Sequence, residues 1–512
     1  MMFNFNKNFN TQLQTDRENL RKMGYIQELD RSIGIFSNFS LSFSVISILT
    51  GLITLYGYSQ EGTGMFLFWT WPFVGVFQLI MVICLGEIAS CYPVAGGVYK
   101  WTNILGNSHI GWFNGWISLL GWIACTTGIN YGLSEFVLAY LGYTAYGNTA
   151  LILIFLMIII LQTLISVLGI KLVTKINDIS VGLHIFGVIA ISVLILIFAD
   201  KDINLGIFSF EKFYLDFQTT NFIPALLMSA WTLTAFDASA NISEECINPS
   251  RTVPYGMILS VVVSIIFGSL LLFSLGQATL VTPNLQGNSI VLYVIGNVLG
   301  PTLSKFFGLI LIMAMLACGL ASQTVTIRIV YAFSRDNGFP FSNIWKIIHG
   351  KYGTPVFSAL LCAALETVLI LIVGLISFIL AFFNLQSQAD LGRALPTITS
   401  LSTVGIYLSY TIVTGCALFK RDKIKSERVE FQTGKFGYAI NIVSFLWAIT
   451  ISGVILFYCN LTTTIFFMVF IVSLAVYYLF YMRKVLEYEY RKLSETELLQ
   501  IEMMRGLQRE GK

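Results

Sequence analysis

Charged residues are scarce in this sequence. Asp, Glu, Lys and Arg make up 11% of its 512 residues, and hydrophobic residues make up 56%. A soluble domain carries about a quarter charged residues. The composition therefore excludes a chain of soluble domains and predicts a protein that crosses the membrane several times. The hydrophobic runs are continuous rather than alternating at every second residue, which predicts helices and not a β-barrel.

Residues typical of metal and catalytic sites are few or scattered. The chain has 3 histidines, and its 8 cysteines lack the paired spacing of a metal site or a disulfide framework. The Gly-x-x-x-x-Gly-Lys-Ser/Thr loop of ATP-hydrolysing proteins is absent. The net charge of +3 gives no indication of a nucleic-acid partner. We therefore expect no enzyme activity, cofactor or metal, and partners limited to a small-molecule substrate and the lipid bilayer.

Long hydrophobic segments are what the sequence does have. Each has about 20 residues, which is long enough to cross a bilayer as a helix. Twelve are predicted: 36–57, 65–88, 112–141, 149–170, 178–199, 221–242, 255–280, 304–331, 356–383, 395–419, 438–459 and 462–482.

The distribution of Lys and Arg predicts the orientation. Loops on one side hold 25 of the 30 basic residues, loops on the other side hold 4, and Arg328 lies within a segment. Basic residues concentrate on the cytoplasmic side, so both termini are expected there. No organelle signal is evident, so we expect the cell (plasma or inner) membrane. The predicted parts are a tail (1–30), a ten-helix core (31–420), helices 11 and 12 (421–482) and a second tail (483–512).

Two of the predicted helices carry polar interruptions. The first contains Ser44, Ser47, Thr50 and Gly51, and the sixth contains the stretch 231–237, which ends in an aspartate. An ionisable side chain at the bilayer centre costs about 2.5–3.5 kcal/mol on insertion scales, so it usually faces protein, water or substrate. Two interrupted helices five segments apart suggest two five-helix repeats of opposite topology, with a binding site between them.

Three motifs resemble those of a known family. They are LGEIASCYPVAGGVYKW (85–101), AWTLTAFDASANISEECINPSRTVPYGM (230–257) and AFSRDNGFP (332–340). Together they resemble the amino acid–polyamine–organocation superfamily, specifically its amino acid/choline transporter family, over residues from about 30 to about 420. The resemblance implies an all-α fold with a ten-helix, 5+5 inverted-repeat (leucine-transporter-type) core and two additional helices. It also implies a secondary active transporter for amino acids or GABA-like zwitterions that works by alternating access.

The resemblance also implies where substrate binds. In relatives, a Gly-Ser-Gly-like turn in helix 1 binds the substrate carboxylate through its backbone; the matching residues here are 49–51, and only Gly51 is kept. The break in helix 6 matches Trp231, Ala235 and Asp237, with alanine where glycine is usual. Both departures leave less room for a substrate to approach the backbone closely.

The expected substrate site lies between helices 1 and 6. Its candidate residues are Ser44, Ser47, Thr50, Gly51, Thr126, Trp231, Thr232, Ala235 and Phe236, with Asn130, Ser322 and Thr324 as weaker candidates. A substrate ammonium over an aromatic ring would gain about 0.5–2 kcal/mol. The alternatives are that the aromatic rings only pack and that the hydroxyls only bond to carbonyls one turn earlier.

A second group of residues is expected to couple or gate transport. Asp237 is either a proton-responsive acid or a helix cap. His184 stands where sodium-independent relatives often have lysine; it either titrates, with H+ as the coupling ion, or stays neutral and buried. Glu87 and the loop 92–99 are expected at a cytoplasmic gate, and Arg335 with Asp336 is expected to form an ion-pair hinge there. The roles of three further charged residues stay open: Arg328, Glu135 and Glu366.

Two other functions remain open on the sequence alone. The substrate could be choline or a polyamine, although a polyamine would favour more acidic groups than Asp237 alone. The chain could also be a nutrient receptor with little transport, although tails of about 30 residues leave no sizeable output domain. Proton symport, exchange and uniport, and the oligomeric state, are not distinguished by the sequence.

Overall fold

The computed structural model describes residues 2–60, 67–143, 147–199, 203–205, 222–282, 289–383, 394–427, 429–458 and 461–489. These residues are almost entirely helical, and they contain only two isolated β-bridges and no strand. The predicted all-helical class is therefore confirmed. Most of the second tail (483–512) lies outside the described residues.

The α-helices follow the chain in this order: α1 (Met2–Lys22), α2 (Ile35–Ile46), α3 (Ile48–Gln60), α4 (Leu67–Cys91), α5 (Gly97–Leu105), α6 (Ser108–Tyr140), α7 (Asn148–Val167), α8 (Ile170–Phe198), α10 (Phe222–Thr232), α11 (Ala238–Asn241), α12 (Pro249–Val281), α13 (Ile290–Arg335), α14 (Ser342–Trp345), α15 (Val356–Phe382), α16 (Ala394–Phe419), α17 (Arg421–Ser426), α18 (Gly437–Tyr458), α19 (Leu461–Tyr477) and α20 (Arg483–Glu489).

Ten helical segments of the described chain are long and hydrophobic enough to cross a membrane. They correspond to ten of the predicted segments. The third and sixth predicted segments fall on α6, which has 33 residues and a more polar sequence, and on α10, which has 11 residues. The chain is a multi-pass membrane protein, and the count of twelve crossings stays a prediction.

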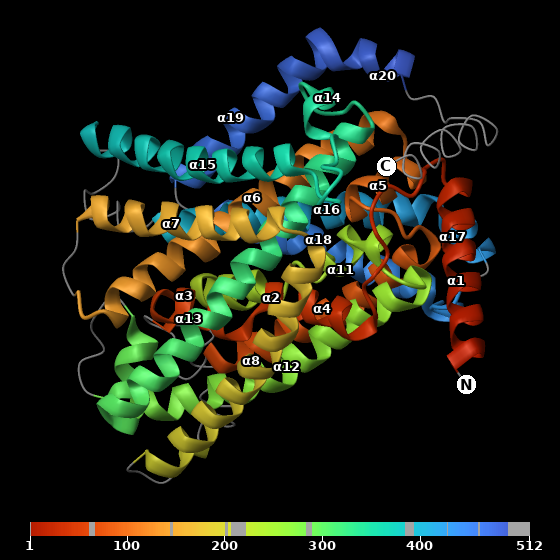
Figure 1. Cartoon of the computed structure of the whole chain (residues 1–512). Helices are drawn as coiled ribbons and strands as arrows, with labels where there is room; N and C mark the ends of the chain where they lie inside the picture. Colours follow the sequence, from red (N-terminus) through yellow and green to blue (C-terminus); the bar gives the residue numbers. More distant parts are fainter. Residues whose placement is uncertain are drawn as a thin grey trace.

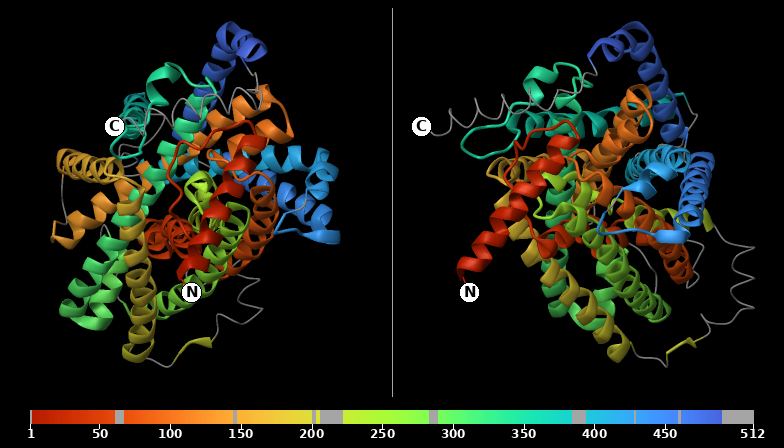
Figure 2. Two further views of the ribbon diagram at one scale, coloured as in Figure 1. Left: turned by 45° about the vertical axis from the view of Figure 1, so that its right-hand side comes forward. Right: turned by 90° about the vertical axis from the view of Figure 1, so that its right-hand side faces the viewer.

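The broken helices lie inside the bundle. Figure 1 shows α2, α3 and α11 surrounded by other helices, with α1, α19 and α20 on the outside. The two views of Figure 2 also place α1 along the outer face of the molecule. α12 packs against α2, α4 and α8, and α6 packs against α13 and α16.

One helix crossing depends on glycine. α6 and α16 meet at Gly121 and Gly405, where a Cβ on Gly405 would lie 2.7 Å from the Gly121 Cα. No side chain fits in that space, so the two backbones touch. This crossing fixes α16 beside the broken helices.

Both predicted interruptions are real breaks. α2 ends and α3 begins around Ser47, whose φ is 28° and ψ is 85°. The family resemblance placed the break at residues 49–51. The observed break lies just before these residues, and Gly51 lies inside α3. α10 ends at Thr232, and Ala235 has a φ of 61°, in the left-handed region that glycine adopts more readily.

Candidate functional site

Hydrogen bonds hold α2 against the break in the sixth segment. The Ser42 hydroxyl donates to the Phe236 carbonyl at 2.8 Å, and the Ser239 backbone N–H donates to the Ser42 hydroxyl at 2.9 Å. The Asn38 amide donates to the Ser239 carbonyl at 3.3 Å. All four residues are buried. These bonds join α2, ahead of its own break at Ser47, to the sixth-segment break and to α11.

Two backbone N–H groups in the first turn of α3 donate hydrogen bonds beside the break. The Leu49 N–H donates to His184 Nε2 at 3.2 Å, and the Thr50 N–H donates to the Ser47 hydroxyl at 3.3 Å. The His184 ring thus uses an unprotonated nitrogen as an acceptor. The buried hydroxyl of Ser44 has no hydrogen-bond partner among the described residues. The break therefore has the positive end of α3 on one side and, in the last turn of α2, an unsatisfied polar atom on the other.

The end of α10 lies directly across from α3. A Cβ added at Gly51 would lie 2.0 Å from the Thr232 hydroxyl oxygen, so the two helices are in contact there. The Thr232 hydroxyl itself bonds to the Met228 carbonyl one turn earlier, at 2.7 Å. The structure brings Gly51 and Thr232 together, as expected for residues that share a site.

The aromatic candidates of the sixth segment contact α16. The Trp231 indole N–H donates to the Ser402 hydroxyl at 3.3 Å. The Phe236 ring stacks on Tyr410, with ring centroids 5.4 Å apart. Both rings are buried. They form part of the wall between the break and α16.

Asp237 is buried at the end of the break. Its carboxylate accepts from the Tyr410 hydroxyl at 2.5 Å and from the Asn241 amide at 3.1 Å. Its side chain makes no capping bond to α11, although Asp237 occupies the N-cap position. The helix-cap alternative is therefore not what this geometry shows.

The candidates outside the two broken helices lie in a different interface. The Thr126 hydroxyl is 2.8 Å from that of Ser322, between α6 and α13. Asn130 exchanges two hydrogen bonds with Gln162 of α7, at 2.8 and 2.9 Å. Thr324 bonds to the Leu320 carbonyl of its own helix at 2.8 Å.

Three ion pairs close one end of the bundle. This ion-pair end is where η3 (Ser243–Glu245), α5 and the last turns of α13 meet. Arg335 binds Glu244 with two bonds of 2.9 and 2.8 Å, and Arg328 binds Glu245 with bonds of 3.3 and 2.8 Å. Lys100 pairs with Asp336.

These pairs correct one expectation and give a partner to one residue whose role was open. Glu244 and Glu245 follow the sixth predicted segment, and both side chains are buried because arginines of α13 neutralise them. Arg335 and Asp336 do not pair with each other, since each binds a residue from another element. Arg328, whose role was open, is the partner of Glu245.

The stretch before α2 covers the ion-pair end. The backbone N–H groups of Ser32 and Ile33 donate to the Glu245 carbonyl at 2.9 and 3.0 Å. The Arg335 guanidinium lies 4.4 Å from the centroid of the Tyr25 ring. The chain ahead of α2 is therefore part of the closure rather than a free tail.

Glu244 is held in its charged form. Burial alone would raise the pKa of its carboxyl, but the Arg335 guanidinium and the Ala95 N–H outweigh burial and lower the pKa below its ordinary value. Positive φ values at Gly96 and Gly97 let the loop before α5 turn tightly enough to present this N–H. The pair thus stays ionised at neutral pH.

Glu87 contacts a different part of the chain. Its carboxylate pairs with Arg421 at 2.6 Å and accepts from the Thr433 N–H and hydroxyl at 3.0 and 2.8 Å. It therefore joins α4 to the connection between α17 and α18, rather than to the loop 92–99.

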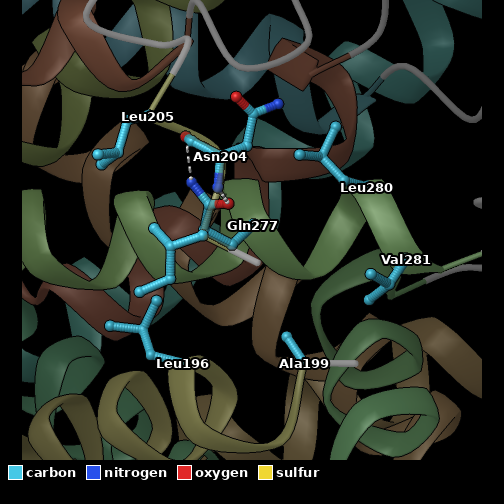
Figure 3. A pocket seen from close by; sticks show the side chains of 8 residues that line it. Leu196, Ala199, Asn204, Leu205, Gln277, Leu280 and Val281 are labelled. Atoms are coloured by element: carbon cyan, nitrogen blue, oxygen red, sulfur yellow. Dashed lines mark hydrogen bonds between the residues drawn. The ribbon is translucent and has the colours of Figure 1, made fainter. Parts of the chain in front are cut away.

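A cavity of about 460 Å³ lies away from the broken helices. Figure 3 shows its lining, in which Asn204 and the Gln277 side chain exchange hydrogen bonds of 2.9 and 3.0 Å. Its lining residues come from 196–205 and from the end of α12. None belongs to α2, α3, α10 or α11, so the candidate site rests on the breaks and not on this cavity.

The contacts of α16 with the sixth segment were not predicted from the sequence. Tyr410 binds Asp237, and the Tyr407 hydroxyl donates to the Ala230 carbonyl at 3.1 Å, near the end of α10. A signal was available, because residues 397–411 contain many Thr, Ser and Tyr residues. Among the ten hydrophobic spans of the described chain, α16 also has the lowest mean hydropathy, 1.4.

Comparison with known proteins agrees with this architecture. The chain is 28% identical over 471 residues to Amino-acid permease BAT1 of Arabidopsis thaliana, covering 85% of this chain and 86% of the relative. It is 29% identical over 480 residues to the BAT1 homolog of Oryza sativa, covering 86% and 87%. It is 27% identical over 390 residues to the GABA-specific permease of Saccharomyces cerevisiae, covering 71% and 66%. The profile of the family described as amino acid permease matches residues 33–482. The chain, with its hydrophobic helices and its two breaks, belongs to this amino acid permease family.

Proposed function

We propose that this protein is a secondary active transporter that carries amino acids or GABA-like zwitterions by alternating access, with its substrate site between the two broken helices. The observation that carries the proposal is that both halves of the first broken segment contact the sixth: Ser42 of α2 bonds to Phe236, and Gly51 of α3 touches Thr232 at the end of α10. The names of the relatives, which include a GABA-specific permease, favour this substrate class.

The two breaks offer opposite polarity to a zwitterion. The first turn of α3 presents the positive end of the helix dipole to a carboxylate. The last turn of α10 presents carbonyls to an ammonium group, with Trp231 and Phe236 as aromatic walls. Ser44 and Thr234 add buried hydroxyls without hydrogen-bond partners among the described residues. A ligand in the break would satisfy them.

The ion-pair end is the cytoplasmic gate in this proposal, and both termini are cytoplasmic. Twelve crossings and a 5+5 inverted repeat are part of this proposal, with α18 and α19 outside the repeat. Glu244 and Glu245 are buried, each bonded to an arginine of α13, which supports an arrangement closed toward the cytoplasm. Opening requires at least the Arg335–Glu244 and Arg328–Glu245 pairs to separate.

A thermal-shift screen tests the substrate class. The purified protein is heated with each of the twenty amino acids, γ-aminobutyrate, choline and polyamines. A ligand that binds only the folded state stabilises it by about 2.7 kcal/mol at 100 times its Kd. We expect a zwitterion to raise the melting temperature in the wild type and to lose this effect in Trp231→Ala.

The screen also separates the alternatives. A shift with choline or a polyamine alone would replace the zwitterion by an organic cation. Binding of a zwitterion without any flux into liposomes would favour a nutrient receptor.

A further inference from the structure

We propose that Glu366 of α15 is a proton-binding site that couples proton movement to transport, outside the site between the broken helices. Its coupling role rests on the proposed transport function. Its proton-binding role does not, because it can be measured without any substrate.

Glu366 is a carboxyl group in surroundings that do not stabilise a charge. Its side chain is 0% exposed, and neither carboxylate oxygen has a hydrogen-bond partner in the described part of the chain. Moving an unpaired carboxylate out of water costs several kcal/mol, and such a group takes up a proton instead. In the arrangement shown, Glu366 therefore fits as the neutral acid.

Polar side chains of two neighbouring helices surround this carboxyl group. Gln323 of α13 lies beside it, outside hydrogen-bond geometry. The Gln323 amide donates to the Thr163 hydroxyl at 3.1 Å and accepts from the Ser166 hydroxyl at 3.4 Å, both on α7. The carboxyl thus faces a hydrogen-bonded polar seam rather than a purely apolar core.

The ionisable groups on the elements around Glu366 are few. Helices α7, α14, α16 and α19, which pack against α15, contain no Asp, Glu, Lys, Arg or His. On α6, His109 lies near the start of the helix against Tyr478, and Glu135 lies near its end. On α15 itself, Cys362 is one turn away and lies within electrostatic range of both Glu366 and Arg328.

Helix α13 links this carboxyl group to the ion-pair end. Arg328 follows Gln323 by five residues, which is about 7.5 Å along the helix axis and about 140° around it. It lies within electrostatic range of Cys362, one turn from Glu366 on α15. In the closed arrangement Arg328 is neutralised by Glu245, with both side chains 1% exposed. When that pair opens, Arg328 becomes an unpaired cation on the helix beside Glu366.

The proton movement follows from this exchange of partners. With Arg328 bound to Glu245, Glu366 holds its proton. With Arg328 released, the carboxylate form of Glu366 is stabilised by the nearby cation, and the proton leaves to the open side. Closing the end restores the Arg328–Glu245 pair, and Glu366 takes up a proton from the opposite side once the bundle has opened there. One proton then crosses the membrane for each full transport cycle.

Infrared difference spectroscopy of the purified protein tests proton binding. A protonated carboxyl group gives a C=O stretching band that shifts in heavy water. We expect the wild type at neutral pH to show a band that is lost in Glu366→Gln and kept in Glu430→Gln, a control at an exposed carboxylate. A spectrum unchanged by Glu366→Gln would overturn the proposal, because it would mean that Glu366 is ionised in place.

Proteoliposomes test coupling. We expect wild-type accumulation of radiolabelled γ-aminobutyrate, or of the zwitterion that gives the largest thermal shift, to require an inward proton gradient. In Glu366→Gln the ratio of zwitterion inside to zwitterion outside should fall to about one. Exchange of zwitterion without a proton gradient should continue, because the permanently neutral side chain still fits the closed form. Gradient-driven accumulation that survives in Glu366→Gln, or wild-type accumulation that ignores the gradient, would overturn coupling.

Two further controls keep the test decisive. If Glu366→Gln does not fold, Glu366→Asp retains an ionisable group and should retain the infrared band and gradient dependence with a shifted pH midpoint; an unshifted midpoint would overturn the proposal. If the wild type shows the infrared band but neither binds nor moves any zwitterion, the proposed function fails while the proton site stands.

Discussion

Gly51 sets how closely α3 and α10 approach at the candidate site. A Cβ at this position would lie 2.0–2.7 Å from atoms of Thr232, including its Cβ, so Gly51→Ala forces the helices apart. Overpacking of this kind costs about 1–3 kcal/mol. We expect a lower melting temperature and reduced zwitterion binding.

The matched control for this change is Gly182→Ala. Gly182 lies in α8 with nothing within 4 Å of an added Cβ. The Gly182→Ala substitution should leave the stability of the protein unchanged or should stabilise the helix by up to about 1 kcal/mol. Equal melting curves for the two variants would contradict the close contact between α3 and α10.

Tyr410 is the residue that holds Asp237 in place. Tyr410→Phe removes the hydroxyl that donates to the buried carboxylate at 2.5 Å. Losing a hydrogen bond to a charged group costs about 1.5–3 kcal/mol. We expect a lower melting temperature and slower uptake. Tyr438→Phe, at an exposed position, should change neither; if Tyr410→Phe behaves like it, Asp237 does not depend on this bond.

At the scale of elements, η3 is held against α13 by buried charges. Glu244→Gln keeps the shape of the side chain but leaves Arg335 without its carboxylate. Breaking a buried pair costs about 3–5 kcal/mol. We expect faster hydrogen–deuterium exchange in residues 25–33 and 95–100, because the ion-pair end opens more often.

An exposed pair provides the control for this prediction. Arg251 and Glu430 are 3.8 Å apart, with side chains 59% and 49% exposed. Pairs of this kind contribute about 0–1 kcal/mol. Glu430→Gln should therefore leave the exchange of both segments unchanged. Equal exchange in the two variants would mean that Glu244 does not hold this end closed.

The same pair predicts how closure depends on pH. The pKa of Glu244 is lowered in the folded protein, since Arg335 outweighs the effect of burial. A group with a lowered folded pKa stabilises the fold above its unfolded pKa, and this contribution is lost as pH falls through the folded pKa. Closure should therefore be constant around neutral pH and weaken only in acid below the ordinary carboxylate range. Exchange of residues 95–100 measured against pH checks this, and opening near neutral pH would contradict it.

At the scale of the whole molecule, the sequence predicted what depends on local composition. A segment of about 20 hydrophobic residues forms a helix in lipid, so the positions of the membrane helices could be predicted directly from the sequence. The helix 6 break could be placed because 231–237 mixes aromatic, hydroxyl and acidic residues. The interruption predicted in the first segment contains the observed break at Ser47, whereas the family resemblance pointed to residues 49–51, because the one matching glycine is Gly51.

Contacts between distant segments could not be predicted. Glu244 and Arg335 are 91 residues apart, and Glu245 and Arg328 are 83 apart. Each carboxylate, taken alone, follows a hydrophobic helix and resembles a residue that has reached water. Its burial depends on an arginine from α13, whose position is set by tertiary packing rather than by local sequence.

Uptake of radiolabelled zwitterions into proteoliposomes tests the central claim most directly. The liposomes are preloaded with unlabelled γ-aminobutyrate or with an amino acid that shifts the melting temperature, and labelled ligand is added outside. We predict that the wild type exchanges label and that Trp231→Ala, at the end of α10, does not. Exchange that is absent from the wild type, or that is equally fast in Trp231→Ala, would contradict transport through a site between the two broken helices.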